Sequence, residues 1–225
     1  MLFLGRMMLS HGFAPEAKGF FDLAEVYTPE LSNNTEYKAL RGASEMMSGH
    51  FTPAFQNLNN PILDKIDEVR IWKAAALSGL DDWQQAAKTL PENLELINTY
   101  PNAIFYPIAL RTAEIALREG NRRKAEKILE MIDERKKDGE SMALAYASSF
   151  QYLNGELDRQ KGDIESAKIH WSELETGKDD LYRAKSRLAM ATLRYGEKEI
   201  TIDKAIDSLE GLRYAWRGDE LETSI

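Results

Sequence analysis

The chain has 225 residues, of which 43% are hydrophobic and 29% are charged, values that are ordinary for a folded globular protein. Its formal net charge of −8 disfavours nucleic acid and anionic membranes as principal partners and suits a basic peptide better. The sequence contains no cysteine, which excludes disulfides, a thiol nucleophile and a cysteine metal site.

The first 13 residues are mostly apolar, but Arg6 interrupts them and no basic segment precedes them. A secretory signal needs a longer uninterrupted apolar stretch behind a positive start, so we interpret this segment as part of a first repeat helix. No run of about 18 apolar residues that could cross a bilayer occurs in the sequence. We therefore expect a soluble, cytoplasmic protein without membrane insertion, or a periplasmic one if a leader is missing.

A loose pattern recurs six times along the chain. It consists of a small residue in a helix, a glycine, an alanine after the glycine, and a large apolar residue four positions past the alanine. The mean separation between copies is about 37 residues, which leaves room for two short helices in each unit. The anchoring glycines are Gly12, Gly49, Gly79, Gly120, Gly162 and Gly196.

We expect an all-α fold in which about six helix pairs stack into one array over residues 1–225, because a short pair cannot bury its apolar face alone. Two copies depart from this spacing: the third by about two residues between Gly79 and Ala86, and the sixth by about four between Gly196 and Ala205. An extra turn of helix is expected between Pro91 and Pro101. The predicted pairs cover residues 1–32, 35–65, 66–100, 102–138, 141–177 and 179–215.

Two sets of residues are predicted to lie in the core. Each copy has a small residue where its two helices cross, since side-chain volume there sets how closely the axes approach. The tryptophans Trp72, Trp83, Trp171 and Trp216 lie within or next to the apolar pattern and are interpreted as core residues. The crossing alanines are Ala17, Ala54, Ala86, Ala125, Ala167 and Ala205.

The first and fifth copies show the repeat at its clearest. The first contains Gly5, Gly12, Ala17 and Phe21, with a closing proline at position 29, and the fifth follows the same order through Trp171. This order resembles the tetratricopeptide repeat over nearly the whole chain. The resemblance implies a right-handed solenoid with a concave groove lined by the first helix of each pair, and protein binding without catalysis as the activity.

The two ends of the chain resemble large bacterial proteins of this repeat class that have no assigned function. The similar segments are LGRMMLSHGFAPEA near the start and YAWRGDELE near the end. No polar capping helix follows the last pair, as solenoids usually have, so we expect a piece of a longer array. Open solenoid ends could also support self-association.

Groove residues follow from the resemblance, as positions on each first helix that face away from its partner helix. A solvated helix face is the simpler interpretation of these side chains. The alternative is a groove that receives an acidic tail or a carboxylate, with arginines as bidentate clamps. The candidate residues are Arg6, Lys73, Glu114, Arg118, Tyr152, Glu156, Arg159, Arg183 and Arg194.

Catalytic and metal-binding patterns are not found in the sequence. The three histidines, His11, His50 and His170, are scattered over different units without acidic residues at metal-ligand spacing. The acidic pairs at positions 81–82 and 179–180 precede helices, where carboxylates favour the positive helix end. No phosphate-binding glycine loop or nucleophile motif is present, and we expect no cofactor.

Three function classes remain open. The first is a non-catalytic scaffold that binds a partner peptide or protein in its groove. The second is a regulatory or structural repeat region of a larger enzyme or cell-envelope assembly. The third is an RNA-binding helical repeat of similar period, which the acidic balance disfavours.

Overall fold

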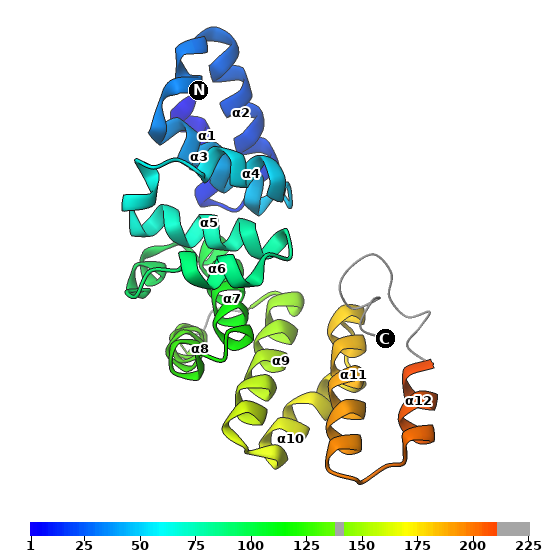
Figure 1. The fold of residues 1–225 in the computed structure, drawn as a ribbon. Helices are drawn as coiled ribbons and strands as arrows, with labels where there is room; N and C mark the ends of the chain where they lie inside the picture. Colours follow the sequence, from blue (N-terminus) through cyan, green and yellow to red (C-terminus); the bar gives the residue numbers. More distant parts are fainter. Residues whose placement is uncertain (138–141, 211–225) are drawn as a thin grey trace. The chain divides into compact units, whose positions relative to one another are not determined.

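The computed structural model describes residues 1–137 and 142–210, which form twelve α-helices and three short 3-10 helices and contain no strand (Figure 1). Contacts join successive helices from the first to the seventh and from the ninth to the twelfth. The boundaries predicted at residues 138, 141 and 215, and the predicted core residue Trp216, lie outside the described residues. The pairs are α1 (Leu2–Ser10) with α2 (Ala14–Tyr27), α3 (Thr35–Met47) with α4 (Phe51–Leu58), α5 (Asp67–Gly79) with α6 (Trp83–Thr89), α7 (Asn102–Arg118) with α8 (Arg122–Lys137), α9 (Leu144–Lys161) with α10 (Ile164–Glu175), and α11 (Asp180–Gly196) with α12 (Ile202–Glu210).

Three short 3-10 helices, η1 (Pro29–Asn33), η2 (Leu63–Lys65) and η3 (Glu95–Thr99), lie between successive pairs in the first half. The turn of helix expected between Pro91 and Pro101 is therefore present as η3. Contacts between residues divide the chain into two compact units, Met1–Glu134 and Arg135–Ile225, called unit 1 and unit 2 below. The single array over the whole chain stays a prediction.

In the first, second and fifth pairs the two helices approach closely where a glycine on the first helix meets a large side chain on the second. A Cβ built on Gly5 would lie 2.4 Å from the ring of Phe21, and one on Gly155 would lie 2.5 Å from Trp171 Nε1. The predicted crossing alanines are all buried, with exposed fractions of 0% in the first five pairs and 8% in the sixth. Close packing of one small and one large residue thus fixes the spacing within a pair.

The turn between the helices of a pair contains one residue with left-handed backbone geometry. Gly162 takes this role in the fifth pair with φ +85°, but in the third and sixth pairs the residues are Asp81 (φ 60°) and Lys198 (φ 61°). The anchoring glycines of these two copies, Gly79 and Gly196, therefore do not occupy the left-handed position. Asp81 precedes Ala86 by five residues, as Gly162 precedes Ala167, which restores the register of the third pair. Aspartate tolerates this conformation better than most residues because its short polar side chain can bond locally.

Gly79 has a packing role instead. A Cβ at this position would lie 2.3 Å from the ring of Phe51, the first residue of α4. The glycine therefore allows α5 to approach the preceding pair. The two residues that the sequence pattern appeared to gain between Gly79 and Ala86 belong to the end of α5 and its turn.

Acidic residues cap helices as predicted. Asp82, Asp163 and Asp179 accept hydrogen bonds from the backbone amides of residues 85, 166 and 182. Hydrogen bonds from Ser166 lower the pKa of Asp163. These carboxylates satisfy amides at helix starts that have no partner within the helix.

The predicted tryptophan core is confirmed for two of the four residues. Trp171 is fully buried and Trp72 is 5% exposed. Trp83 is half-buried, and the guanidinium carbon of Arg118 lies 3.8 Å from its ring centroid. Trp83 thus lies at the edge of the core, beneath a cation.

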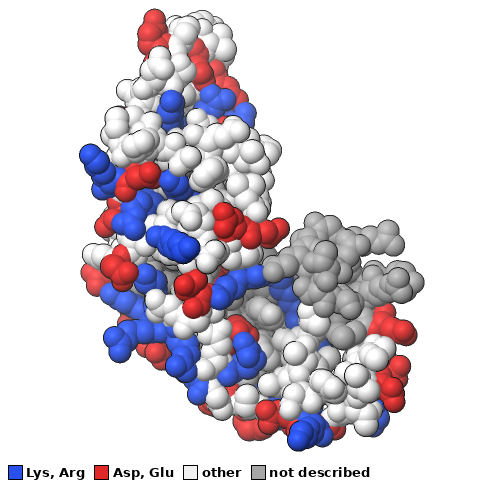
Figure 2. Space-filling view, in the orientation of Figure 1, with Lys and Arg blue, Asp and Glu red and all other residues white. Residues whose placement is uncertain are grey.

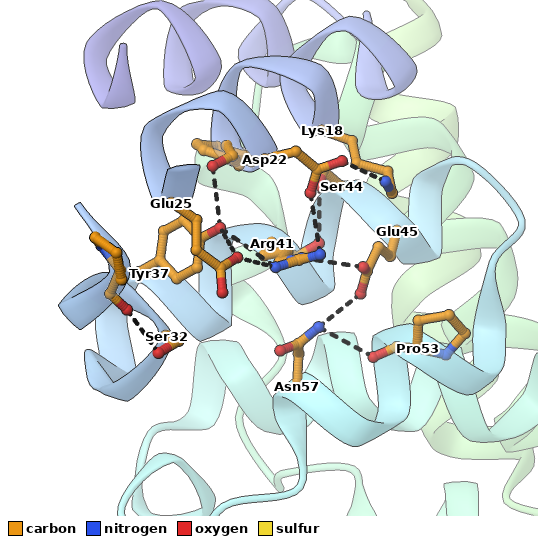
Figure 3. Close-up of polar contacts among 12 residues, drawn as sticks. Lys18, Asp22, Glu25, Ser32, Tyr37, Arg41, Ser44, Glu45, Pro53 and Asn57 are labelled. Carbon is orange, nitrogen blue, oxygen red and sulfur yellow. Dashed lines mark hydrogen bonds and ion pairs between the residues drawn. The ribbon is translucent and has the colours of Figure 1, made fainter. Parts of the chain in front are cut away.

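A cluster of charged residues joins the first pair to the second (Figure 3). Arg41 of α3 is ion-paired with Glu25, with Asp22 at 3.0 Å, and with Glu45 at 3.3 Å. The hydroxyl of Tyr37 lies 2.8 Å from Glu25 Oε2, and burial together with this bond raises the pKa of Tyr37 to about 12. Because these side chains come from both α2 and α3, their ion pairs and hydrogen bonds hold adjacent pairs together.

Candidate binding groove

The face of unit 1 formed by α1, α3 and α5 is hollowed by a groove of about 410 Å³. On α3 the lining residues Glu36, Ala39, Leu40 and Ala43 follow helical spacing and make one stripe. This stripe lies away from the face of α3 on which Arg41 binds α2. The apolar lining of the groove includes Leu9, Leu40, Ala43, Leu58, Val69 and Ile104.

The start of α7 closes one end of the groove. Gly12, in the turn after α1, has φ +83°, and a Cβ built on it would lie 2.9 Å from Cβ of Ala103. The end of α1 and the beginning of α7 are therefore in contact, although about 90 residues separate them. Ile104 and Tyr100 line the groove next to this contact.

One wall of the groove carries an ion pair between two helices. Arg6 of α1 is paired with Glu36 of α3, and the side chains are 49% and 69% exposed. An ion pair this exposed contributes at most about 1 kcal/mol to stability. It can therefore rearrange when a ligand enters.

The opposite wall carries a carboxylate held by a chain of hydrogen bonds. Nε1 of Trp72 donates to the Tyr100 hydroxyl at 2.9 Å, and that hydroxyl donates to Oε1 of Glu68 at 3.0 Å. Burial, with the negative charge of Glu68 adding to it, raises the pKa of Tyr100. The hydroxyl therefore stays protonated and remains a donor to Glu68, which lies in the first turn of α5.

Four of the nine predicted groove residues lie in unit 1. Arg6 lines the groove, as expected. Lys73 differs from the expectation, because it is only 9% exposed and its Nζ donates to Asp64 at 2.7 Å. It follows Trp72 on α5 and so lies on another side of the helix. Arg118 donates to Glu114 one turn earlier on α7, at 3.2 Å.

The other five predicted residues lie in unit 2. Arg159 donates two hydrogen bonds to Glu156, at 2.9 and 2.6 Å. Arg183 donates to Asp180 Oδ1 at 2.5 Å and to the Gly177 carbonyl at 3.1 Å. These two guanidinium groups, which were expected to clamp a partner's carboxylate, thus bind acceptors within their own helix or the preceding turn.

The remaining two have different surroundings. Tyr152 packs on Trp171, with ring centroids 6.1 Å apart. Arg194 lines a polar hollow of about 460 Å³ between α11 and α12, together with Arg187 and Lys204. Figure 2 shows acidic and basic side chains interspersed over the visible face of the described residues.

Sequence reasoning missed most of the groove. The stripe through Glu36, Ala39 and Ala43 was detectable in the sequence from its helical spacing. The meeting of Trp72 with Tyr100 was not, because 28 residues separate them and Tyr100 belongs to the segment between α6 and α7.

Two further observations concern chemistry and environment. In residues 1–137 and 142–210, no group of three or more histidine, aspartate or glutamate side chains is placed to hold a metal ion. No helix in the same described ranges has the length and apolar character needed to cross a bilayer. Comparisons with protein-family models, curated proteins and solved structures found no match to this chain.

Proposed function

We propose that the chain is a helical-repeat protein of the tetratricopeptide type that binds a segment of a partner protein in the groove of unit 1, without catalysing a reaction. The observation that carries the proposal is the apolar hollow on the face made by the first helices of successive pairs. This is the face on which the sequence resemblance places a binding groove.

The composition of the lining favours recognition over chemistry. Most of its residues are apolar, and the charged ones are Arg6, Glu36 and Glu68. The hydroxyl of Ser10 donates to the Met7 carbonyl at 2.8 Å within its own helix. Concave apolar sites with a few placed polar groups are typical of ligand binding, and an apolar groove across helices suits a peptide presenting apolar side chains.

The proposal is tested with a displayed random-peptide library selected against the parent protein. The peptides obtained are then measured against Ala39→Trp, which fills the groove from α3, and against Gln56→Trp, which adds the same side chain at an exposed position of α4. We expect Ala39→Trp to weaken binding at least tenfold, or about 1.4 kcal/mol, and Gln56→Trp to leave it unchanged.

Circular dichroism and thermal unfolding establish that both variants fold. If the parent selects no peptide, or if its peptides bind Ala39→Trp as tightly as the parent, the groove is not a peptide site.

A further inference from the structure

We infer that the groove selects a partner segment with a lysine or arginine next to a bulky apolar side chain, and that Glu68 is the residue that binds the cation. This inference rests on the proposed function and adds the chemical class of the partner. It differs from the acidic tail considered from the sequence.

The balance of charge in the groove favours a cationic partner. Arg6 and Glu36 form an ion pair and so neutralise each other. Glu68 accepts a hydrogen bond from Tyr100, but no cation among the described residues is paired with it. A ligand entering the groove therefore meets one uncompensated negative charge beside an apolar floor, which attracts a cation and repels a carboxylate.

The position of the Glu68 carboxylate is set before any ligand arrives. Trp72, which is 5% exposed, positions the Tyr100 hydroxyl, and Tyr100 in turn positions Glu68. The first turn of a helix also favours a negative charge. A carboxylate that is already ordered loses little side-chain entropy on binding, so its ion pair with a ligand contributes more to affinity.

Two aromatic rings flank the same point. The rings of Trp72 and Tyr100 meet edge to face, with centroids 5.8 Å apart, and both residues line the groove. A lysine or arginine bound at Glu68 would therefore lie near aromatic surface, which attracts cations. The apolar side chain of the ligand would fill the hollow between α1 and α3.

The test uses one selected peptide in three versions, with lysine, glutamine or glutamate at the position next to its apolar anchor. Each is measured by isothermal titration calorimetry against the parent, Glu68→Gln and Glu16→Gln. Glu16 is exposed at the start of α2, outside the groove, so its variant has the same change in net charge. A third variant, Tyr100→Phe, keeps the ring and removes the donor to Glu68.

We expect the parent to bind the lysine peptide about tenfold more tightly than the glutamine peptide, and the glutamate peptide most weakly. In Glu68→Gln the lysine preference should fall to less than about twofold, whereas Glu16→Gln should retain it. The preference should also weaken with added salt. Tyr100→Phe should give an intermediate preference.

The outcomes distinguish the cation site at Glu68 from the proposal that the groove binds a peptide. If Ala39→Trp abolishes binding but Glu68→Gln keeps the full lysine preference, or if the parent binds all three peptides equally, the cation site is wrong and the groove remains a peptide site. If no peptide binds the parent, both fail.

Discussion

The pairs α3/α4 in unit 1 and α9/α10 in unit 2 share one skeleton. In each pair a glycine of the first helix packs against a large residue of the second, Gly42 against Leu58 and Gly155 against Trp171. In each, a left-handed glycine and a buried alanine follow at the same spacing. The contacts between the two helices are thus alike in these two pairs.

The inner faces of the same two pairs differ. Counted from the left-handed glycine, Ala39 and Ala43 of α3 occupy the positions that Tyr152 and Glu156 occupy in α9. The small side chains leave a hollow in unit 1, whereas Tyr152 covers Trp171 in unit 2. The positions that hold a pair together are therefore separate from those that form a binding surface, and one can change without the other.

The strongest test of the shared skeleton removes its largest residue. Trp171 is fully buried, and its replacement by alanine should lower the free energy of unfolding of unit 2 by about 3–5 kcal/mol. Guanidinium denaturation followed by circular dichroism measures this loss. Trp83→Ala is the control. That ring is half-buried, so its removal should lower the free energy of unfolding by less. A Trp171→Ala protein as stable as the parent would contradict the packing of the fifth pair.

A second test adds one methyl group at the close approach. Gly155→Ala and Gly42→Ala should each lower the free energy of unfolding by about 1–3 kcal/mol, because the new Cβ overlaps the large side chain of the second helix. Gly19→Ala should instead stabilise by up to about 1 kcal/mol, since it lies inside α2 with nothing within 4 Å of the added carbon. Equal effects at all three glycines would show that helix propensity alone, and not packing, decides the outcome.

A third test concerns the polar cluster that distinguishes unit 1. The folded state raises the pKa of Tyr37 to about 12 from 10.0, so folding favours the protonated phenol. Its contribution to stability is complete below about pH 10 and is lost as the pH rises through about 12.

The Tyr37→Phe variant should lose about 1 kcal/mol at neutral pH and show a weaker decline in alkali. The pKa of Tyr100 is also raised in the folded protein, so Tyr100 still makes the Tyr37→Phe variant lose stability in alkali. The loss of stability at high pH should therefore be reduced in this variant and not abolished. Urea unfolding of both proteins at about pH 8 and about pH 11 checks this. Parallel declines in the two proteins would mean that Tyr37 is not the group that titrates.

The smallest effect is expected at the charged inner face of unit 2. Arg159→Glu breaks a half-exposed pair with Glu156 and should change stability by less than about 1 kcal/mol. Peptide binding in the groove should be unaffected, because the lining residues all belong to unit 1. A loss of binding in this variant would instead support the arginine clamp considered from the sequence.

The sequence allowed the helix pairs to be located because their small, glycine and alanine positions recur in the same order, with the same glycine-to-alanine spacing in four of the six copies. The third copy departed from the pattern by two residues because the left-handed position is defined by backbone geometry, and Asp81 can fill it without a glycine. The groove was harder to predict, since it depends on side chains that meet across pairs. Neither the hydrogen bond from Trp72 to Tyr100 nor the ion pair between Arg159 and Glu156 follows from helical spacing alone.

The contact between Gly12 and Ala103 has a consequence for how unit 1 folds. In an array where each pair contacts only its neighbours, folding can start anywhere and the ends can open independently. A contact across about 90 residues must instead wait for the pairs between to assemble, which slows folding and couples the ends. Unit 1 is therefore expected to unfold as one cooperative block, with the first pair protected from hydrogen exchange as long as α7 remains in place.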